Sequence, residues 1–310
     1  MTSQNPHSRS SAGRTALAVF QLSRLPAVFS AWADILVGQG IAAGRIDFSK
    51  PSLYWLLVAT TGLYLSGMIF NDVADRKIDL RERPGRPIPS GRVSLNLAAG
   101  LGLVLLSGGL IASACAGPKS IMIGLLIAIA AQGYNFILKG TLIGCLVMGL
   151  CRGLNVLLGA SPELGWPIVE QLPAAFAIIY MFYIAGLTWF ARQESEATIH
   201  RQELLGGIYL STGARILWAL QILTRPMSMT AGIAFVLLIT IWIRSVKRLV
   251  SISQKPTAPL VQQGVRSLLL VIIPQHALLL LGLSGDYIGA LIVLLLIVPA
   301  RRLSRYMAIT

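Results

Sequence analysis

Apolar residues follow one another along the chain in runs long enough for membrane helices, each of which needs about 20 mostly apolar residues. Only a helix satisfies its own backbone hydrogen bonds inside lipid, apart from a closed barrel, whose strands alternate in polarity. The pattern therefore predicts an all-α, polytopic membrane bundle of nine or ten transmembrane helices. The expected spans are residues 24–43, 52–70, 95–116, 119–138, 141–160, 172–191, 207–223, 228–246, 264–283 and 286–300.

Two places leave the number of spans open. The span at 207–223 is weak because it contains Arg215, and only a short turn at 284–286 separates the last two spans. We expect residues 1–20, which are mostly polar, to form a disordered cytoplasmic tail. Residues 21–303 are expected to form one transmembrane domain. The first apolar run has spanning length and no clear cleavage site, so no signal peptide is predicted.

Composition supports a membrane protein. Hydrophobic residues make up 55% of the chain and charged residues only 12%, against about 25% in an ordinary soluble domain. The net charge is +14, but the basic residues lie between apolar runs, where they suit an anionic lipid surface. We therefore expect membrane lipid as a partner and no nucleic acid. The three cysteines, Cys115, Cys145 and Cys151, fall in apolar segments and predict neither a disulfide nor a zinc site.

The distribution of basic residues predicts the orientation. Six arginines and lysines lie in the 71–94 loop, and more follow in the 247–263 loop and the C-terminal tail, whereas 161–171 has none. Loops rich in Lys and Arg usually face the cytoplasm. Both termini and the 71–94 loop are therefore placed on the cytoplasmic side.

Acidic residues are few and clustered. Seven of the twelve lie in two loops: Asp72, Asp75, Asp79, Glu82, Glu194, Glu196 and Glu203. In the run 71–79, three aspartates are spaced i, i+3 and i+7. If the preceding span continues as a helix, these side chains share one face.

Such a run favours a metal and diphosphate site. Neighbouring carboxylates repel one another unless a cation neutralises them, and Mg²⁺ prefers oxygen ligands completed by substrate phosphates. The nearby Arg81, Arg83, Arg86 and Arg92 suit diphosphate oxygens. The alternative is a solvated loop with casual ion pairs, which would not favour three aspartates on one face.

The motif resembles a known family. Asn71-Asp72-x-x-Asp75-x-x-x-Asp79, followed by Arg83-Pro84-x-Arg86-Pro87-x-x-Ser90-Gly91, is similar to the first motif of the UbiA superfamily of intramembrane prenyltransferases. Tyr134-Asn135-x-x-x-Lys139, at the end of the fourth span, is similar to a second element of that family.

The resemblance implies a bundle, typically of nine helices, around a lateral lipid-accessible cavity. It also implies an enzyme that uses Mg²⁺ to condense a polyprenyl diphosphate with an acceptor. Asn71, Asp72, Asp75 and Asp79 would bind the metal, with Asp72 and Asp75 taking part in catalysis. The leaving diphosphate would be held or protonated by Arg86, Lys139 and Tyr134, with Asn135 beside them as a further substrate-binding residue.

The second acidic motif departs from the family pattern. After the sixth span the chain has Trp189-Phe190-Ala191-Arg192-Gln193-Glu194-Ser195-Glu196, which contains no aspartate. Glu194 is left as a ligand or a catalytic base, and Gln193 as a hydrogen-bonding substrate residue. Together with Cys151-Arg152-Gly153-Leu154-Asn155 upstream, this run resembles the EboC-like branch, which is associated with secondary-metabolite gene clusters. We expect a protein of a bacterial inner or cell membrane with both acidic loops cytoplasmic.

Several polar residues inside the spans leave alternatives open. Arg152 is costly in a membrane span, so it either faces the cavity with Asn155 and binds substrate or pairs with Asp34. His276 is expected to be a hydrogen-bonded bundle residue. Arg24 is expected either to reach the headgroups or to reach the diphosphate, with the first favoured.

Two functions remain at this stage. The first is a prenyltransferase that acts on an aromatic or other lipophilic acceptor. The second is a non-catalytic protein of the same fold that binds a secondary-metabolite precursor or helps it cross the membrane. The complete first motif favours the enzyme, because binding alone needs no metal–diphosphate face. A secondary transporter is disfavoured because the chain shows no paired broken helices.

Overall fold

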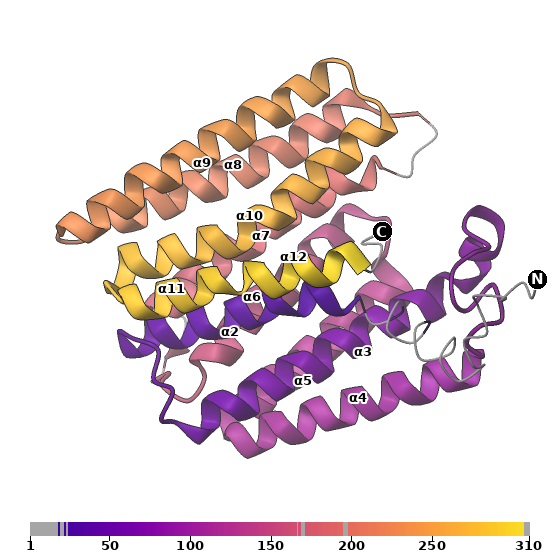
Figure 1. Cartoon of the computed structure of the whole chain (residues 1–310), viewed down its shortest axis with the longest axis horizontal. Coiled ribbons are helices and arrows are strands. Elements are labelled where there is room, and N and C mark those ends of the chain that lie inside the picture. Colours follow the sequence, from indigo (N-terminus) through magenta and orange to yellow (C-terminus); the bar gives the residue numbers. More distant parts are fainter. Residues whose placement is uncertain are drawn as a thin grey trace, which may run out of the picture.

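The computed structural model describes residues 18, 22, 24–165, 167–168, 171–194 and 198–306, with side chains up to residue 303. This part of the chain is helical, without strands (Figure 1). The elements are η1 (Leu25–Ala27), α2 (Val28–Ala43), α3 (Pro51–Glu82), α4 (Leu95–Ala116), α5 (Pro118–Gly133), η2 (Tyr134–Leu138), α6 (Leu142–Ala160), α7 (Leu172–Arg192), α8 (Arg201–Leu223), α9 (Met229–Gln254), α10 (Ala258–Ser284), α11 (Tyr287–Leu295) and α12 (Ile297–Tyr306).

The predicted membrane bundle is confirmed. Eight helices of the described chain are long and apolar enough to cross a membrane: α2 with η1, α3, α4, α5 with η2, α6, α7, α9 and α10. The two uncertain spans account for the rest of the expected nine or ten. The first, α8, packs between α7 and α9 and contains Arg215. The second is divided at Leu296 into α11 and α12, which have 9 and 10 residues.

Local sequence signals set several helix ends. The side chains of Ser94, Thr141 and Ser228 each accept a hydrogen bond from a backbone N–H of the first turn that follows. Asp286 caps α11 at Gly289 N and also accepts a hydrogen bond from Ile46 N at 2.8 Å. This carboxylate therefore ties the α2–α3 loop to the start of α11.

Close packing of α6 depends on glycine. A Cβ atom at Gly149 would lie 2.1 Å from the Met181 carbonyl oxygen of α7, and one at Gly159 would lie 2.2 Å from the Ile35 oxygen of α2. No side chain fits at either position, so α6 approaches both neighbours at backbone distance. This contact holds the polar residues of α6 inside the bundle.

The third helix is longer than a membrane crossing requires. With 32 residues it is about 48 Å long, whereas the hydrocarbon core is about 30 Å thick. The run 71–79 therefore stays helical beyond the apolar span, as its spacing predicts. The fifth helix ends differently, in the π-helical turn η2, a type of turn that often occurs at functional sites.

The N-terminal segment lies mostly outside the described residues, and with it most of the expected tail at 1–20. Within it, Ala18 is described as helical and buried, as is Leu22. Both pack in a small apolar cluster with Ile69 and Val73 of α3.

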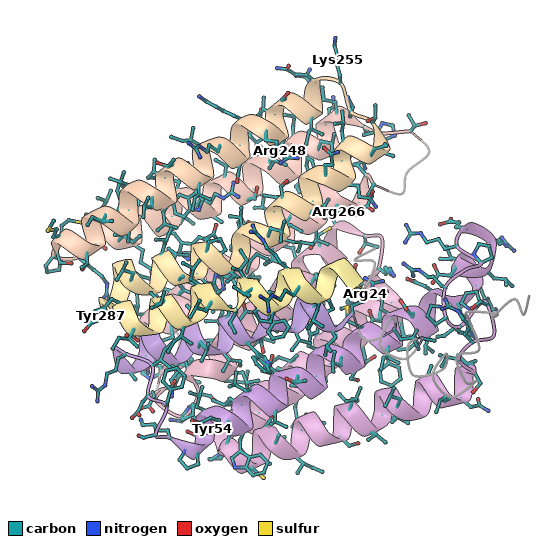
Figure 2. All side chains as sticks on the ribbon, viewed as in Figure 1. Arg24, Tyr54, Arg248, Lys255, Arg266 and Tyr287 are labelled. Atoms are coloured by element: carbon teal, nitrogen blue, oxygen red, sulfur yellow. The ribbon has the colours of Figure 1, made fainter. Side chains whose placement is uncertain are left out.

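The two ends of the bundle differ in chemistry. Figure 2 shows Lys255, Arg266 and Arg24 toward one end, where α3 and α9 also finish. Tyr54 and Tyr287 lie at the opposite end and are 54% and 70% exposed. Exposed tyrosines at a helix end suit the membrane interface. The acidic run of α3 therefore shares its end of the molecule with basic residues.

Candidate active site

The run 71–79 forms the C-terminal part of α3. Asp72 and Asp79 are buried, with 6% and 4% of their surface exposed, while Asp75 and Asn71 are half-buried. Charged carboxylates are rarely buried without partners. Each of the three aspartates has a cationic partner.

Asp72 and Asp79 face two arginines. Nη1 of Arg86 lies 2.7 Å from Oδ2 of Asp79 and 3.5 Å from Oδ1 of Asp72. Nη2 of Arg24 lies 3.4 Å from the same Asp72 oxygen. The sequence left Arg24 between the headgroups and the site, with the headgroups favoured. The structure places it against Asp72, because the chain turns inward at Arg24, which has a left-handed φ of 45° before Leu25 and Pro26.

Asp75 and Asn71 face Lys139. The Lys139 ammonium forms an ion pair with Asp75 and lies 2.8 Å from Oδ1 of Asn71. Asn71 Nδ2 in turn donates to Asp75 Oδ2 at 3.3 Å. Lys139 follows η2 directly, and Asn135 of that turn donates to the Gly67 carbonyl oxygen of α3 at 2.9 Å. The π-helical turn thus holds Lys139 beside the acidic run.

The donors suit a metal that is shared with a substrate. Within the described residues, no three His, Cys, Asp or Glu side chains converge closely enough to hold a metal ion alone. The Lys139 ammonium nevertheless lies where oxygens of Asn71 and Asp75 converge, which shows that these groups can hold a cation. Mg²⁺ is usually bound by one or two carboxylates plus substrate phosphates. The residues therefore fit Mg²⁺ completed by a diphosphate and do not fit a protein-only cage.

A second polar assembly lies inside the bundle. Nη2 of Arg152 on α6 is 3.0 Å from Oδ1 of Asp34 on α2 and 3.0 Å from the hydroxyl oxygen of Tyr180 on α7. The same nitrogen donates to the Ser30 carbonyl oxygen at 3.1 Å. Pairing of Arg152 with Asp34 is therefore observed.

Asp34 collects further donors and is fully buried. Asn155 Nδ2 donates to its Oδ2 at 3.1 Å, and His276 Nε2 lies 3.0 Å from its Oδ1. Thr60 of α3 donates to Asn155 Oδ1 at 2.7 Å. His276 is thus a hydrogen-bonded bundle residue, as predicted, and the network joins α2, α3, α6, α7 and α10.

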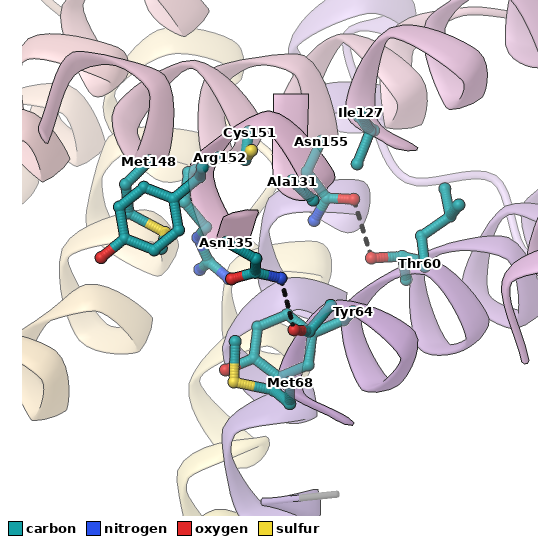
Figure 3. A pocket seen from close by; sticks show the side chains of 13 residues that line it. Thr60, Tyr64, Met68, Ile127, Ala131, Asn135, Met148, Cys151, Arg152 and Asn155 are labelled. Carbon is teal, nitrogen blue, oxygen red and sulfur yellow. Dashed lines mark hydrogen bonds between the residues drawn. The ribbon is translucent and has the colours of Figure 1, made fainter. Parts of the chain in front are cut away.

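A pocket lies beside the interior network and close to the acidic run, although no residue of the run 71–79 lines it. It has a volume of about 70 Å³ and lies between α3, α5, η2 and α6. Tyr134 and Asn135 of η2, the turn that leads to Lys139, line it together with Arg152 and Asn155 of the interior network. Figure 3 shows Asn135, Arg152 and Asn155 around the pocket. Its other walls are mostly apolar, among them Leu63, Met68, Ile127 and Met148. Arg152 therefore pairs with Asp34 and also faces the pocket, whereas its binding of substrate stays a prediction.

The loop after α7 uses its polar groups differently. Gln193 is buried, and its Oε1 accepts a hydrogen bond from His200 N at 2.7 Å. Glu194 is half-buried and accepts from Gln262 Nε2 of α10 at 3.1 Å. In the described part of the chain, no contact joins either residue to the run 71–79, and Glu196 lies outside the described residues. The observed contacts connect this loop to α8 and α10.

Sequence patterns alone did not single out several members of these assemblies. Ser30, Thr60 and Tyr180 are common residue types in apolar helices, and no spacing marks them. The only available signal was indirect, since a buried arginine at 152 requires acceptors.

With this geometry in view, the chain can be compared with known proteins. Residues 31–248 match the UbiA prenyltransferase family. The chain belongs to this family. A digeranylgeranylglyceryl phosphate synthase from Sulfurisphaera tokodaii is 29% identical over 169 residues, which are 54% of this chain and 59% of that protein. A 4-hydroxybenzoate octaprenyltransferase from Vibrio parahaemolyticus is 28% identical over 177 residues, 56% of this chain and 57% of the relative.

Solved structures agree in fold. A UbiA homolog from Aeropyrum pernix K1 has a TM-score of 0.66 at 15% identity, covering 86% of this chain and 97% of that one. A homolog from Archaeoglobus fulgidus bound to GPP and Mg²⁺ has a TM-score of 0.61 at 16% identity, covering 82% and 99%. The predicted fold class is thus confirmed by the UbiA fold. The sequence matches span somewhat more than half the length of the two curated relatives above.

Proposed function

We propose that this protein is an intramembrane prenyltransferase that condenses a polyprenyl diphosphate with an aromatic or other lipophilic acceptor, using Mg²⁺. One observation supports this most directly: three aspartates and three cations face one another beside an apolar pocket. The named activities of the two curated relatives, both prenyl-group chemistries, support the same reaction class.

The site would work by exchange of ion-pair partners. In the structure, Arg24, Arg86 and Lys139 neutralise the aspartates. A diphosphate offers these cations more strongly charged oxygens, so they would turn to it and free the carboxylates. Asn71, Asp72, Asp75 and Asp79 would then hold Mg²⁺, which when bound supplies Lewis-acid stabilisation of the leaving diphosphate.

The pocket would shield the reacting carbon. When the C–O bond breaks, the diphosphate leaves with the electron pair, and an allylic cation remains. Apolar walls at Leu63, Met68 and Met148 keep water from this cation. Tyr134 and Asn135 would position the diphosphate end of the substrate. Arg152 and Asn155, whose Nη2 and Nδ2 atoms are held by Asp34, would contact the other end of the bound substrate.

The acceptor must lose a proton after it forms the new carbon–carbon or carbon–oxygen bond. Glu194 is the proposed base, with Gln193 beside it as a hydrogen-bonding residue. Glu194 contacts only the neutral Gln262 amide in the described structure, so its carboxylate is not neutralised by an ion pair there. The acceptor would replace or share this contact.

We also propose a placement in the cell and within the family. The basic end of the molecule, which includes the acidic run, would face the cytoplasm of a bacterial inner or cell membrane. The runs 151–155 and 189–196 favour the EboC-like branch of the family.

The reaction can be tested with purified protein in lipid nanodiscs, supplied with Mg²⁺ and labelled prenyl diphosphates of several lengths. Lipid mass spectrometry should detect a prenylated product that is lost in Asp72→Asn and Asp75→Asn. The matched control is Asp47→Asn, which changes a half-buried carboxylate in the 44–50 loop at the other end of α3. Unchanged product formation in both site variants would refute the proposal.

A non-catalytic function is the second candidate. It is favoured by one observation, the structural use of Gln193 and Glu194 where the family pattern has an aspartate-rich motif. Such a protein would bind a secondary-metabolite precursor or help it cross the membrane. The same assay separates the two, because a carrier would bind prenyl diphosphate or precursor without releasing diphosphate.

A further inference from the structure

A second hollow lies away from the acidic run, between α9 and α10. It has a volume of about 250 Å³, and its polar lining consists of Arg244, Ser245, Arg248 and Ser267. None of its lining residues belongs to α3, α5 or α6, so it is separate from the pocket described above. We refer to it as the α9–α10 groove.

The arginines of the groove have no acidic partner within the described residues. Arg244 and Arg248 are exposed, and so is Arg266, one residue before Ser267 on α10. The ion pairs in this part of the chain involve other residues, and none includes these three arginines. The hydroxyl of Ser245 also has no described hydrogen-bond partner, while Ser267 donates to the Gln263 carbonyl oxygen at 2.8 Å. The groove therefore presents unused donors.

Counted from the start of α9, the groove lies where a membrane-spanning helix would approach the lipid headgroups. Arg244 and Arg248 come 15 and 19 positions after Met229, where α9 begins. At about 1.5 Å per residue they lie about 22 and 28 Å along the helix, close to the 30 Å or so of a hydrocarbon core. Figure 2 shows Arg248, Arg266 and Lys255 along the same end of the α9–α10 pair.

The lining combines two chemistries. Guanidinium groups four residues apart on one helix face match the oxygens of a phosphate group, and serine hydroxyls add further hydrogen bonds. The floor is apolar, with Ile241, Leu249, Leu268 and Val271. Neighbouring side chains such as Ile243 and Leu270 are 49% and 45% exposed, as suits a surface that faces lipid tails.

We propose that the α9–α10 groove binds the phosphate headgroup of an anionic phospholipid, with the glycerol and first acyl carbons on the apolar floor. A free phosphate ion would use the arginines but not the floor. General attraction of basic residues to an anionic leaflet would use charge alone and would not depend on the groove.

The test measures lipid binding to the full chain purified in detergent, by native mass spectrometry and by the thermal shift on lipid addition. The probes are phosphatidylglycerol, phosphatidylcholine, inorganic phosphate and geranyl diphosphate. We expect phosphatidylglycerol to bind best. Arg244→Gln with Arg248→Gln should weaken this binding about tenfold or more, because both guanidinium groups lose their charge-assisted hydrogen bonds to the phosphate oxygens.

Two matched variants separate the groove from general electrostatics. Lys247→Gln with Lys255→Gln removes two charges from the same helix end, outside the groove lining, where only screened long-range attraction is lost, and should change binding by no more than about twofold. Ser267→Leu fills the groove without changing the charge and should weaken phosphatidylglycerol binding as the arginine variant does.

Three outcomes would overturn the proposal. Equal weakening by the arginine and lysine double variants would show diffuse attraction. If inorganic phosphate raised the unfolding temperature as much as phosphatidylglycerol does, the groove would be a small-anion site. Stronger groove-dependent binding of geranyl diphosphate would show an isoprenoid site instead. Because the exposed arginines are not needed for packing, the arginine variant remains informative even if Ser267→Leu misfolds. None of these outcomes depends on prenyl transfer.

Discussion

Two assemblies of aspartate with arginine lie in this bundle, one at the end of α3 and one in its interior. At the end of α3, Asp72 and Asp79 share Arg86, whose side chain is 15% exposed, and Lys139 beside Asp75 is 36% exposed. In the interior, Asp34 is completely buried and binds Arg152, Asn155 and His276, which come from two other helices.

The difference in burial separates the functions of the two assemblies. The buried Asp34 carboxylate cannot lose Arg152 without leaving a charge unpaired, so the interior network fixes the bundle. The α3 assembly is reached by solvent at Lys139 and Arg24, and its cations can turn to a ligand at low cost. The same residue types thus form a structural lock in one place and, in the proposed reaction, a site for ligand exchange in the other.

The largest expected effect is on the interior lock. Asp34→Ala should lower the free energy of unfolding by about 3–5 kcal/mol, because it leaves Arg152 buried without an anion. Thermal unfolding in detergent measures this. Ser284→Ala, eight residues after His276 at the end of α10 and without a contact to the network, serves as a control. A loss below about 1 kcal/mol would mean that the interior assembly exchanges partners as readily as the exposed one.

The second prediction concerns the α3 assembly, where we expect a large loss of reaction rate and only a small loss of stability. Asp72→Asn is expected to slow prenyl transfer by about 100-fold or more, since a preorganised charge at the leaving group is lost. Its unfolding free energy should change by no more than about 1 kcal/mol, because the remaining contacts of Arg86 and Arg24 are partly solvated. Steady-state kinetics and thermal unfolding of the same preparation test both parts. If Asp72→Asn lost stability but kept its rate of prenyl transfer, the contrast between the two assemblies would be wrong.

The third prediction concerns the loop after α7. Glu194→Gln keeps an acceptor for Gln262 and removes the proposed base, so transfer should slow by about tenfold or more while prenyl diphosphate affinity stays the same. Single-turnover kinetics and binding of the diphosphate separate these quantities. Glu194→Gln at full activity would place the base elsewhere and leave this loop with a structural role alone.

The smallest effect is expected at the edge of the interior network. Thr60→Val keeps the side-chain shape but leaves Asn155 Oδ1 without its donor at 2.7 Å. The expected loss is about 1 kcal/mol of unfolding free energy. Thr240→Val on α9 is the control, because its exposed hydroxyl donates only within its own helix, to the Val236 carbonyl oxygen. Equal effects of the two variants would show that Thr60 adds nothing specific to the network.

The helical bundle could be predicted because lipid makes strict demands on each segment separately. A span needs length and apolar character, and both are local properties of the sequence. The same holds for the acidic run, since three aspartates at i, i+3 and i+7 share a face of any helix that contains them. The uncertain spans were those that the local sequence does not decide. Helix α8 contains a buried arginine, and the segment of α11 and α12 is interrupted after nine residues.

Partner choice was decided only by the tertiary structure. Nothing in the sequence around Arg24 distinguishes a headgroup contact from one with Asp72, which is 48 residues away. Likewise, the sequence offered pairing of Asp34 with Arg152 as one alternative. The contact of Asp34 with His276, 242 residues away, depends on how α10 packs against α2. Contacts of this kind arise from helix packing, which depends on the shapes of many side chains at once. The amino-acid sequence by itself thus determined a membrane bundle with an acidic, metal-suited helix end. Folding decided which cations neutralise that end and which carboxylate is locked inside, because only packing brings distant charges within hydrogen-bonding distance.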